Sequence, residues 1–138
     1  MKLKDKGPIK PPPQLTKFPQ FVSKEIQSWD GIIAATHWDL YERTKPDGAD
    51  FYVGETELGH IHLDGEVHLA TGLTLAKELI KNKLASKFQY GADWVTCPIN
   101  SAEEASHAIR LFTLNYRRIK GEPMEELMKE IKSRNELS

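Results

Sequence analysis

Apolar and polar positions alternate along residues 60–69 with the period of two that predicts β-strands. Ile61, Val67 and Leu69 are apolar, and three of the chain's five histidines occupy positions that alternate with them. A strand pair built on this segment has one apolar face for the core and one face rich in imidazole groups. The alternation therefore predicts a half-buried hairpin.

The turn of this hairpin decides which side chains share a face. If residues 63–65 form a three-residue loop, His60 lies opposite His68, and Gly65 takes the left-handed conformation that suits a residue without a Cβ atom. A two-residue turn at residues 64–65 would place Ile61 opposite His68 and mix the two faces. We favour the three-residue loop because it keeps the apolar residues apart from the histidines.

The remaining apolar positions predict a mixture of helices and strands. Helical spacing predicts helices over residues 18–29, 73–84, 101–119 and from 123 onward. Short apolar runs predict strands over residues 32–38, 51–53 and 94–99, with a turn at residues 46–48. Ser101 and Glu104 match the capping-box pattern that opens a helix.

Strands in succession, followed by helices around one further strand, indicate the α+β class. We expect a mainly antiparallel sheet of about five strands with helices packed on one face. The uncovered face then carries the histidines.

Composition sets the expected boundaries at the two ends of the chain. Five of the eight prolines lie in the first nineteen residues, so residues 1–15 are predicted to form an extended Pro/Lys-rich arm. Residues 16–121 are expected to form a single α+β domain, and residues 122–138 a C-terminal helix. The apolar stripe of this helix is expected to dock either on the core or on a second copy of the chain, and the second arrangement would give a homodimer. The stripe consists of Met124, Leu127, Met128 and Ile131.

Charge and cysteine content narrow the possible partners. The net charge of −1 and the absence of a basic stripe argue against nucleic acid as a partner. No apolar run approaches the roughly 20 residues of a membrane span, so no membrane partner is expected. The single cysteine, Cys97, has no partner for an internal disulfide, which agrees with a cytoplasmic location.

The candidate site residues are His60, His62, His68 and Glu66. We expect the histidines to act without a cofactor, as general base and oxyanion partners toward an acidic hydroxyl group, with His62 paired to Glu66 as the base. Alternatively, the three imidazoles bind a divalent metal, zinc or iron, with Glu66 as a ligand or as a partner that fixes a tautomer. The third alternative is a hydrogen-bonded polar sheet face without a ligand.

Other reactive side chains have structural interpretations. His37 is expected to make a local hydrogen bond at a strand end, and His107 to pair with Glu103 on a helix surface. Cys97 is expected to be a small buried residue. The acidic residues between positions 39 and 50 are expected to be solvated; they are Asp39, Glu42, Asp47 and Asp50.

A longer pattern surrounds the hairpin. It consists of Glu57-Leu58-Gly59-His60-Ile61-His62, then Asp64-Gly65 and His68-Leu69, a helix, a strand ending in Pro98, and a helix opened by Glu103-Glu104-Ala105. Over roughly residues 51–116 this pattern resembles the small domain family named after the fungal luciferase. The resemblance implies oxidation of a hydroxylated pyrone by molecular oxygen, with light emission and no known organic or metal cofactor.

Carried over to this sequence, the family's histidines correspond to His60, His62 and His68. Relatives usually carry a Trp-Gly pair and a nearby His-Pro pair after the helix, whereas residues 82–88 contain neither, and Pro98-Ile99 replaces a Pro-Arg pair. We therefore expect a small-molecule site on the histidine face rather than luciferase activity itself. Whether the site is catalytic is left open; if it is, the expected activity is that of an oxidoreductase that acts on a small hydroxylated substrate with molecular oxygen. The alternatives are a non-catalytic interaction or dimerisation module and a divalent-metal-binding protein.

Overall fold

Six strands form one antiparallel sheet, in the order β1-β2-β3-β4-β6-β5, in the computed structural model, which describes residues 2–137. The strands are β1 (Ile32–Trp38), β2 (Pro46–Val53), β3 (Thr56–His62), β4 (Glu66–Leu69), β5 (Ser86–Lys87) and β6 (Val95–Pro98). The helices are α1 (Lys17–Gln27), α2 (Leu73–Lys81), α3 (Ala102–Ile119) and α4 (Met124–Leu137), after a short 3-10 helix, η1 (Leu3–Asp5). This architecture confirms the predicted α+β class.

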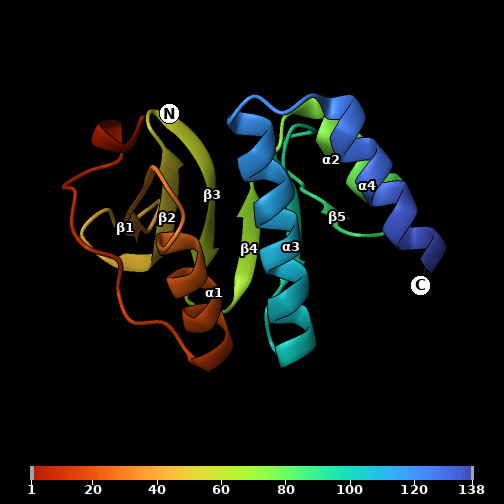
Figure 1. The fold of residues 1–138 in the computed structure, drawn as a ribbon. Coiled ribbons are helices and arrows are strands. Elements are labelled where there is room, and N and C mark those ends of the chain that lie inside the picture. Colours follow the sequence, from red (N-terminus) through yellow and green to blue (C-terminus); the bar gives the residue numbers. More distant parts are fainter. Residues whose placement is uncertain (1, 138) are drawn as a thin grey trace.

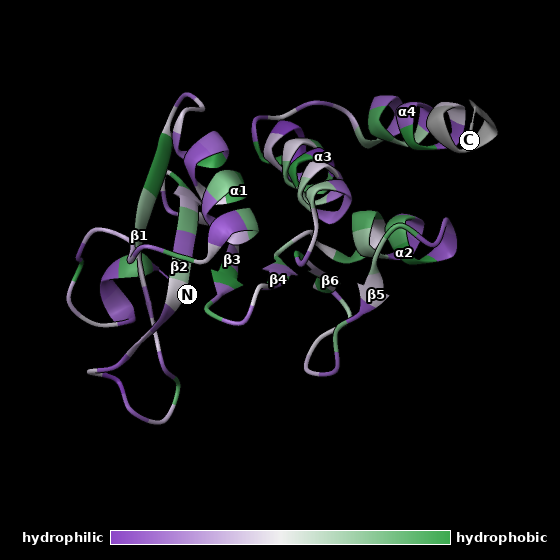
Figure 2. Cartoon of the chain, turned by 90° about the horizontal axis from the view of Figure 1, so that it is seen from below, coloured by the Kyte–Doolittle hydropathy of each residue, from purple (hydrophilic) through white to green (hydrophobic). Residues whose placement is uncertain are grey.

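The helices lie on one face of the sheet and enclose the core. Helices α1 and α3 cross this face, and α2 and α4 continue the layer beside β5 (Figure 1). Ile61, Val67 and Leu69 are fully buried in the core beneath these helices, as the alternation predicted. The rings of Phe51 and Phe112 meet edge to face, with centroids 6.0 Å apart. Figure 2 shows the loops after β1 and β5 on the opposite side of the sheet.

The hairpin adopts the predicted three-residue loop. His60 pairs with His68, and Ile61 pairs with Val67, across β3 and β4. Gly65 has a φ of +88°, and its N–H donates to the carbonyl of His62 at 2.9 Å. The register that gathers the histidines on one face is therefore confirmed.

Three details of the secondary structure differ from the prediction. Strand β2 begins at Pro46, where a turn was expected, because proline is tolerated at the first residue of a strand. Strand β5 was missed because two residues are too few to show a period. Helix α2 ends at Lys81, because Lys83 takes a left-handed conformation with a φ of +59°. Ser101 caps α3 as expected and accepts a hydrogen bond from the Glu104 N–H at 3.1 Å.

The N-terminal arm crosses the sheet edge as a strap along β1. Thr36 donates from its N–H to the carbonyl of Lys10 at 2.8 Å, and from its hydroxyl to the carbonyl of Pro11 at 2.7 Å. The indole N–H of Trp38 donates to the carbonyl of Pro8 at 2.9 Å. These contacts fix the position of the residues that precede α1.

Helix α4 packs on its own chain. Leu127 and Ile131, two residues of its apolar stripe, are fully buried in the core. These side chains are therefore not available to a second copy. Among the described residues, no helix combines the length and the apolar character needed to cross a membrane.

Replacing Gly65 by alanine should lower the free energy of unfolding more than the same change at Gly54. Both glycines have positive φ, +88° and +61°, and alanine costs about 1–2 kcal/mol in this region. A Cβ atom at Gly65 would also lie 2.9 Å from the carbonyl oxygen of Ile99, whereas nothing lies within 4 Å at Gly54. Urea denaturation of G65A and G54A should show an extra loss of about 1–3 kcal/mol in G65A. Equal losses would contradict the close packing of the turn against Ile99.

Candidate functional site

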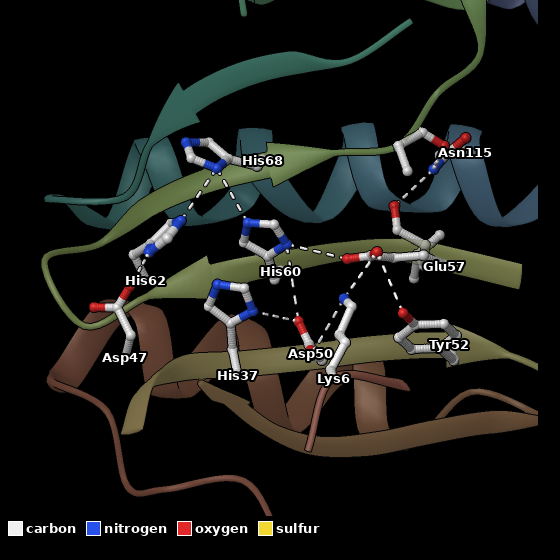
Figure 3. A network of polar contacts seen from close by, with 12 residues as sticks. Lys6, His37, Asp47, Asp50, Tyr52, Glu57, His60, His62, His68 and Asn115 are labelled. Carbon is white, nitrogen blue, oxygen red and sulfur yellow. Dashed lines mark hydrogen bonds and ion pairs between the residues drawn. The ribbon is translucent and has the colours of Figure 1, made fainter. Parts of the chain in front are cut away.

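Four histidines gather on the face of the sheet opposite the helices (Figure 3). His60 and His62 come from β3, His68 from β4 and His37 from β1. The Nε2 atoms of His60 and His62 each lie 3.1 Å from Nδ1 of His68. The predicted trio is therefore in direct contact.

His37, which was expected to make only a local hydrogen bond, belongs to the same cluster. Its ring stacks on that of His60, with centroids 4.0 Å apart and planes at 11°. It also lies 5.0 Å from the His62 ring, edge to face. Gly48 makes this approach possible because it pairs with His37 on one side and with His62 on the other, and it places no side chain between them.

Each imidazole also faces a carboxylate through one ring nitrogen, which in His60, His62 and His68 is the nitrogen that contacts no neighbouring histidine. Nδ1 of His37 lies 2.7 Å from Asp50, Nδ1 of His62 lies 2.8 Å from Asp47, and Nδ1 of His60 lies 3.1 Å from Glu57. Nε2 of His68 lies 3.4 Å from Glu66. A carboxylate accepts hydrogen bonds, so it favours a proton on the nitrogen that faces it. These contacts direct the unprotonated nitrogens inward.

Two irregularities of the sheet aim two of these carboxylates. Between β1 and β2 the register shifts so that Asp47 has no cross-strand partner. Between β2 and β3 the register shifts again, so that Leu58 is the unpaired residue and Glu57 pairs with Tyr52. Such β-bulges re-aim side chains and are frequent next to active sites. Without the second bulge, strict alternation would send Glu57 to the face opposite His60.

The deepest part of the site is a buried charge network around Asp50. The Asp50 side chain is fully buried, and Lys6 Nζ lies 3.4 Å from its Oδ2 and 2.9 Å from Glu57 Oε1. The Tyr52 hydroxyl donates to Glu57 at 3.3 Å. The expectation that Asp47 and Asp50 are solvated charges is thus wrong, because both face imidazole groups.

Burial and charge shift the pKa values of this network. Burial lowers the pKa of His60 to about 4, which keeps its ring neutral at neutral pH. Burial alone would raise the pKa of Glu57, but the hydrogen bond with His60 and the charge of Lys6 outweigh it and lower that pKa to about 2. Burial also opposes the charge of Lys6, yet Glu57 and Asp50 raise the pKa of its ammonium group above its ordinary value.

The sequence analysis predicted that Glu66 pairs with His62, and this prediction is wrong. It lies beside Nε2 of His68 and accepts a hydrogen bond from the Thr96 hydroxyl at 2.8 Å. The carboxylate at His62 is Asp47, which lies 15 residues away in sequence. The prediction failed because it considered only side chains within the hairpin.

A pocket of about 340 Å³ opens above the histidines. Aromatic and aliphatic side chains form its walls, and the histidines form its floor. The lining residues are His37, Trp38, Leu40, Asp47, His60, His62, His68, Phe88, Tyr90 and Trp94. The Phe88 ring lies 4.7 Å from that of His68, and the Trp94 ring lies 5.6 Å from that of His60. This combination suits a small ligand with one apolar and one polar side.

Two groups of side chains in the described part have the spacing of metal ligands. In the first group, one ring nitrogen from each of His37, His60 and His62 lies within 4.8 Å of the corresponding nitrogens of the other two residues. In the second group, donor atoms of Asp50, Glu57 and His60 lie within the same distance of one another. The second group already holds a cation, the ammonium group of Lys6. The first group, together with His68, which contacts His60 and His62 at 3.1 Å, is the one that a metal could enter.

The remaining candidate residues lie outside this site. His107 makes a 2.6 Å contact from its Nε2 to the carbonyl of Leu84 rather than pairing with Glu103. Cys97 is buried, as expected, and burial raises the pKa of its thiol to about 12. Both residues line a separate pocket of about 640 Å³, away from the histidine cluster.

Comparison with known proteins identifies one relationship. The model of the family described as Luciferase domain matches residues 55–115. This match confirms the resemblance inferred from the His-x-His and Asp-Gly pattern. No curated protein and no solved structure matches the chain. Three of the four clustered histidines lie inside the matched segment, and His37 lies outside it.

Replacing Lys6 by methionine should strongly destabilise the fold. The change leaves Asp50 and Glu57 buried without their ammonium partner, and breaking a buried pair in this way costs about 3–5 kcal/mol. The matched control is Lys2→Met, since Lys2 lies 3.6 Å from Glu55 with both side chains more than half exposed. That change should cost less than about 1 kcal/mol. Equal stabilities of the two variants in urea denaturation would contradict the network.

The free energy of unfolding should fall at acidic pH, and Glu57 should be responsible for the part of the decline below pH 4.5. Its pKa of about 2 lies below the ordinary 4.5, so the unfolded chain binds the proton more tightly. The resulting stabilisation, of the order of 3 kcal/mol, is complete above pH 4.5 and lost as the pH falls toward 2. The lowered pKa of His60 acts in the same direction, between 6.5 and about 4.

Urea denaturation across this range should therefore show a two-part decline. Glu57→Gln should remove the part below pH 4.5 and leave the part above it. An unchanged slope below pH 4.5 in E57Q would contradict the assignment.

Proposed function

We propose that this chain, whose residues 55–115 match the Luciferase domain, binds a small planar hydroxylated compound above its histidine cluster and oxidises it with molecular oxygen. The observation that carries the proposal is the pocket of about 340 Å³, which has aromatic walls and an imidazole floor. The family match supports the class of reaction.

The walls of the pocket favour a flat ligand. Phe88 and Trp94 lie 5.9 Å apart at an angle of 33° and border the same space. Aromatic rings that stack on a ligand contribute about 0.5–1.5 kcal/mol each beyond the area they bury. The volume lies at the lower end of the range of small-molecule sites, which begins at about 300 Å³.

The floor of the pocket favours a hydroxyl group that can lose its proton. The inward nitrogens of the imidazoles are acceptors, because the outward nitrogens face carboxylates. An acidic phenol or enol that approaches this floor can donate its proton, and the anion that results is electron-rich. The ligand then supplies the electrons, and molecular oxygen is the oxidant.

Binding can be tested with a hydroxylated pyrone and its O-methylated analogue, followed by tryptophan fluorescence. Trp38 and Trp94 line the pocket, whereas Trp29 packs on Tyr116 with ring centroids 5.3 Å apart. Quenching by the hydroxylated compound should therefore persist in W29F and decrease in W94F. The methylated analogue should bind at least about tenfold more weakly, since it has no proton to donate to the floor. Oxygen consumption in an electrode cell then tests turnover.

The matched pair of variants is Phe88→Ala and Phe21→Ala. Phe88 lines the pocket, whereas Phe21 is 60% exposed and belongs to α1. F88A should weaken binding by about tenfold, which corresponds to 1.4 kcal/mol, and F21A should leave it unchanged. Equal affinities of the two variants would show that the ligand does not enter this pocket.

A further inference from the structure

We propose that His60, His62 and His68 are the ligands of a divalent metal ion, held at the floor of the pocket with one coordination position open to it. Metal binding requires only these side chains and can be tested without an organic ligand.

Both distances that join His68 to its two neighbours fit a shared ion. Nε2 of His60 and Nε2 of His62 each lie 3.1 Å from Nδ1 of His68. Two nitrogens bound to one zinc ion at about 2.0–2.1 Å and at a tetrahedral angle lie about 3.3 Å apart. The two contacts of His68 therefore have nearly the separation of nitrogen atoms that share one ion.

Hydrogen bonds alone do not satisfy this arrangement. Glu57 and Asp47 favour protons on Nδ1 of His60 and His62, which leaves lone pairs on both Nε2 atoms. Nδ1 of His68 carries at most one proton, yet it faces both lone pairs at the same distance. A cation between the three nitrogens accepts all three lone pairs at once.

The surroundings of the trio are those of metal-binding histidines. Such histidines almost always donate their second ring N–H to a carboxylate, a carbonyl or water, and this partner fixes the tautomer. Here Glu57, Asp47 and Glu66 face the second nitrogens of His60, His62 and His68. Together with Asp50, four carboxylates surround the cluster. Among the described residues, the ion-pair contacts place Lys6 against two of them, Asp50 and Glu57. An added cation is therefore electrostatically favoured.

His37 is assigned a positioning role rather than a place among the ligands. Its ring is nearly parallel to that of His60, at 11° with centroids 4.0 Å apart, so it packs against the face of that ligand. It shares Asp50 with Lys6 and holds the His60 ring from one side. Three protein ligands and one open position are typical of catalytic rather than structural metal sites.

With the ion bound, its open position would take the place of the inward nitrogens in receiving the hydroxyl group of a ligand. A metal lowers the pKa of a hydroxyl group that binds to it, as it does for water. This consequence rests on the proposed function, because it requires a hydroxylated ligand in the pocket. Imidazole ligands suit zinc, iron, copper and nickel, so the choice among these metals is left to the measurement.

The experiment uses the full chain purified without a histidine tag and stripped with a chelator. Titration with zinc in a calorimeter should show one ion per chain, and Co²⁺ should give the visible absorbance bands of a nitrogen-bound ion. His62→Ala should weaken zinc binding by about 100-fold or more, since even the loss of a supporting carboxylate costs about 10–100-fold. His62 is the most exposed of the three ligands, at 20%, so this variant is the one best suited to retain the fold.

Two further variants keep the test decisive. Asp47→Asn leaves all ligands in place and should weaken binding by about 10–100-fold through the loss of its charge on His62. His107→Gln is the control, because His107 contacts the carbonyl of Leu84 and should leave zinc binding unchanged. Circular dichroism of each variant checks the fold.

Stoichiometric zinc that is lost in H62A and retained in H107Q would support the proposal. No stoichiometric binding, or equal binding by H62A and H107Q, would overturn it. If the pyrone binds and zinc does not, the metal proposal fails and the proposed function stands. If zinc binds and the pyrone does not, the proposed function fails and the metal site stands.

Discussion

The structure depends on the burial of the Asp50 carboxylate in the middle of β2. A carboxylate without solvent must have partners, because an isolated buried charge is strongly unfavourable. Here the partners come from distant parts of the chain: Lys6 from the N-terminal arm and His37 from β1. The arm is therefore part of the fold, and its hydrogen bonds along β1 hold Lys6 where the charge is needed. Removing water from this region also keeps the adjacent His60 ring neutral.

The same network shows how much of the site the sequence could predict. The alternation of Ile61, Val67 and Leu69 with histidines gave the hairpin, its register and the three imidazoles on one face, because a strand's side chains follow a fixed period. The partners of these imidazoles followed no such period. Asp47 and Glu57 reach the cluster through two β-bulges, which shift the alternation by one residue and leave no mark in the apolar pattern.

Long-range pairing was the second limit. His37 and Asp50 meet His60 only because β1, β2 and β3 are neighbours, and a single sequence does not reveal which strands pair. One signal was nevertheless present. Asp50 stands between Ala49 and Phe51, both fully buried, so a charged residue inside an apolar run marked a position that needed a partner. Gly48, which pairs with both His37 and His62, marked a place where two larger side chains could meet.

The position of His37 also bears on the resemblance to the luciferase family. That resemblance leads one to expect a further histidine in the segment after α2, where this chain has residues 82–88 and no histidine. Phe88, from that segment, lies against His68 as an apolar wall. The fourth imidazole comes instead from β1, outside the matched residues 55–115. Since Lys6, Asp47 and Asp50 lie outside that segment as well, the candidate site of this protein includes side chains from the N-terminal arm, β1 and β2. A comparison of relatives by the matched segment alone would therefore omit Lys6 and two of the four carboxylates that face the histidines.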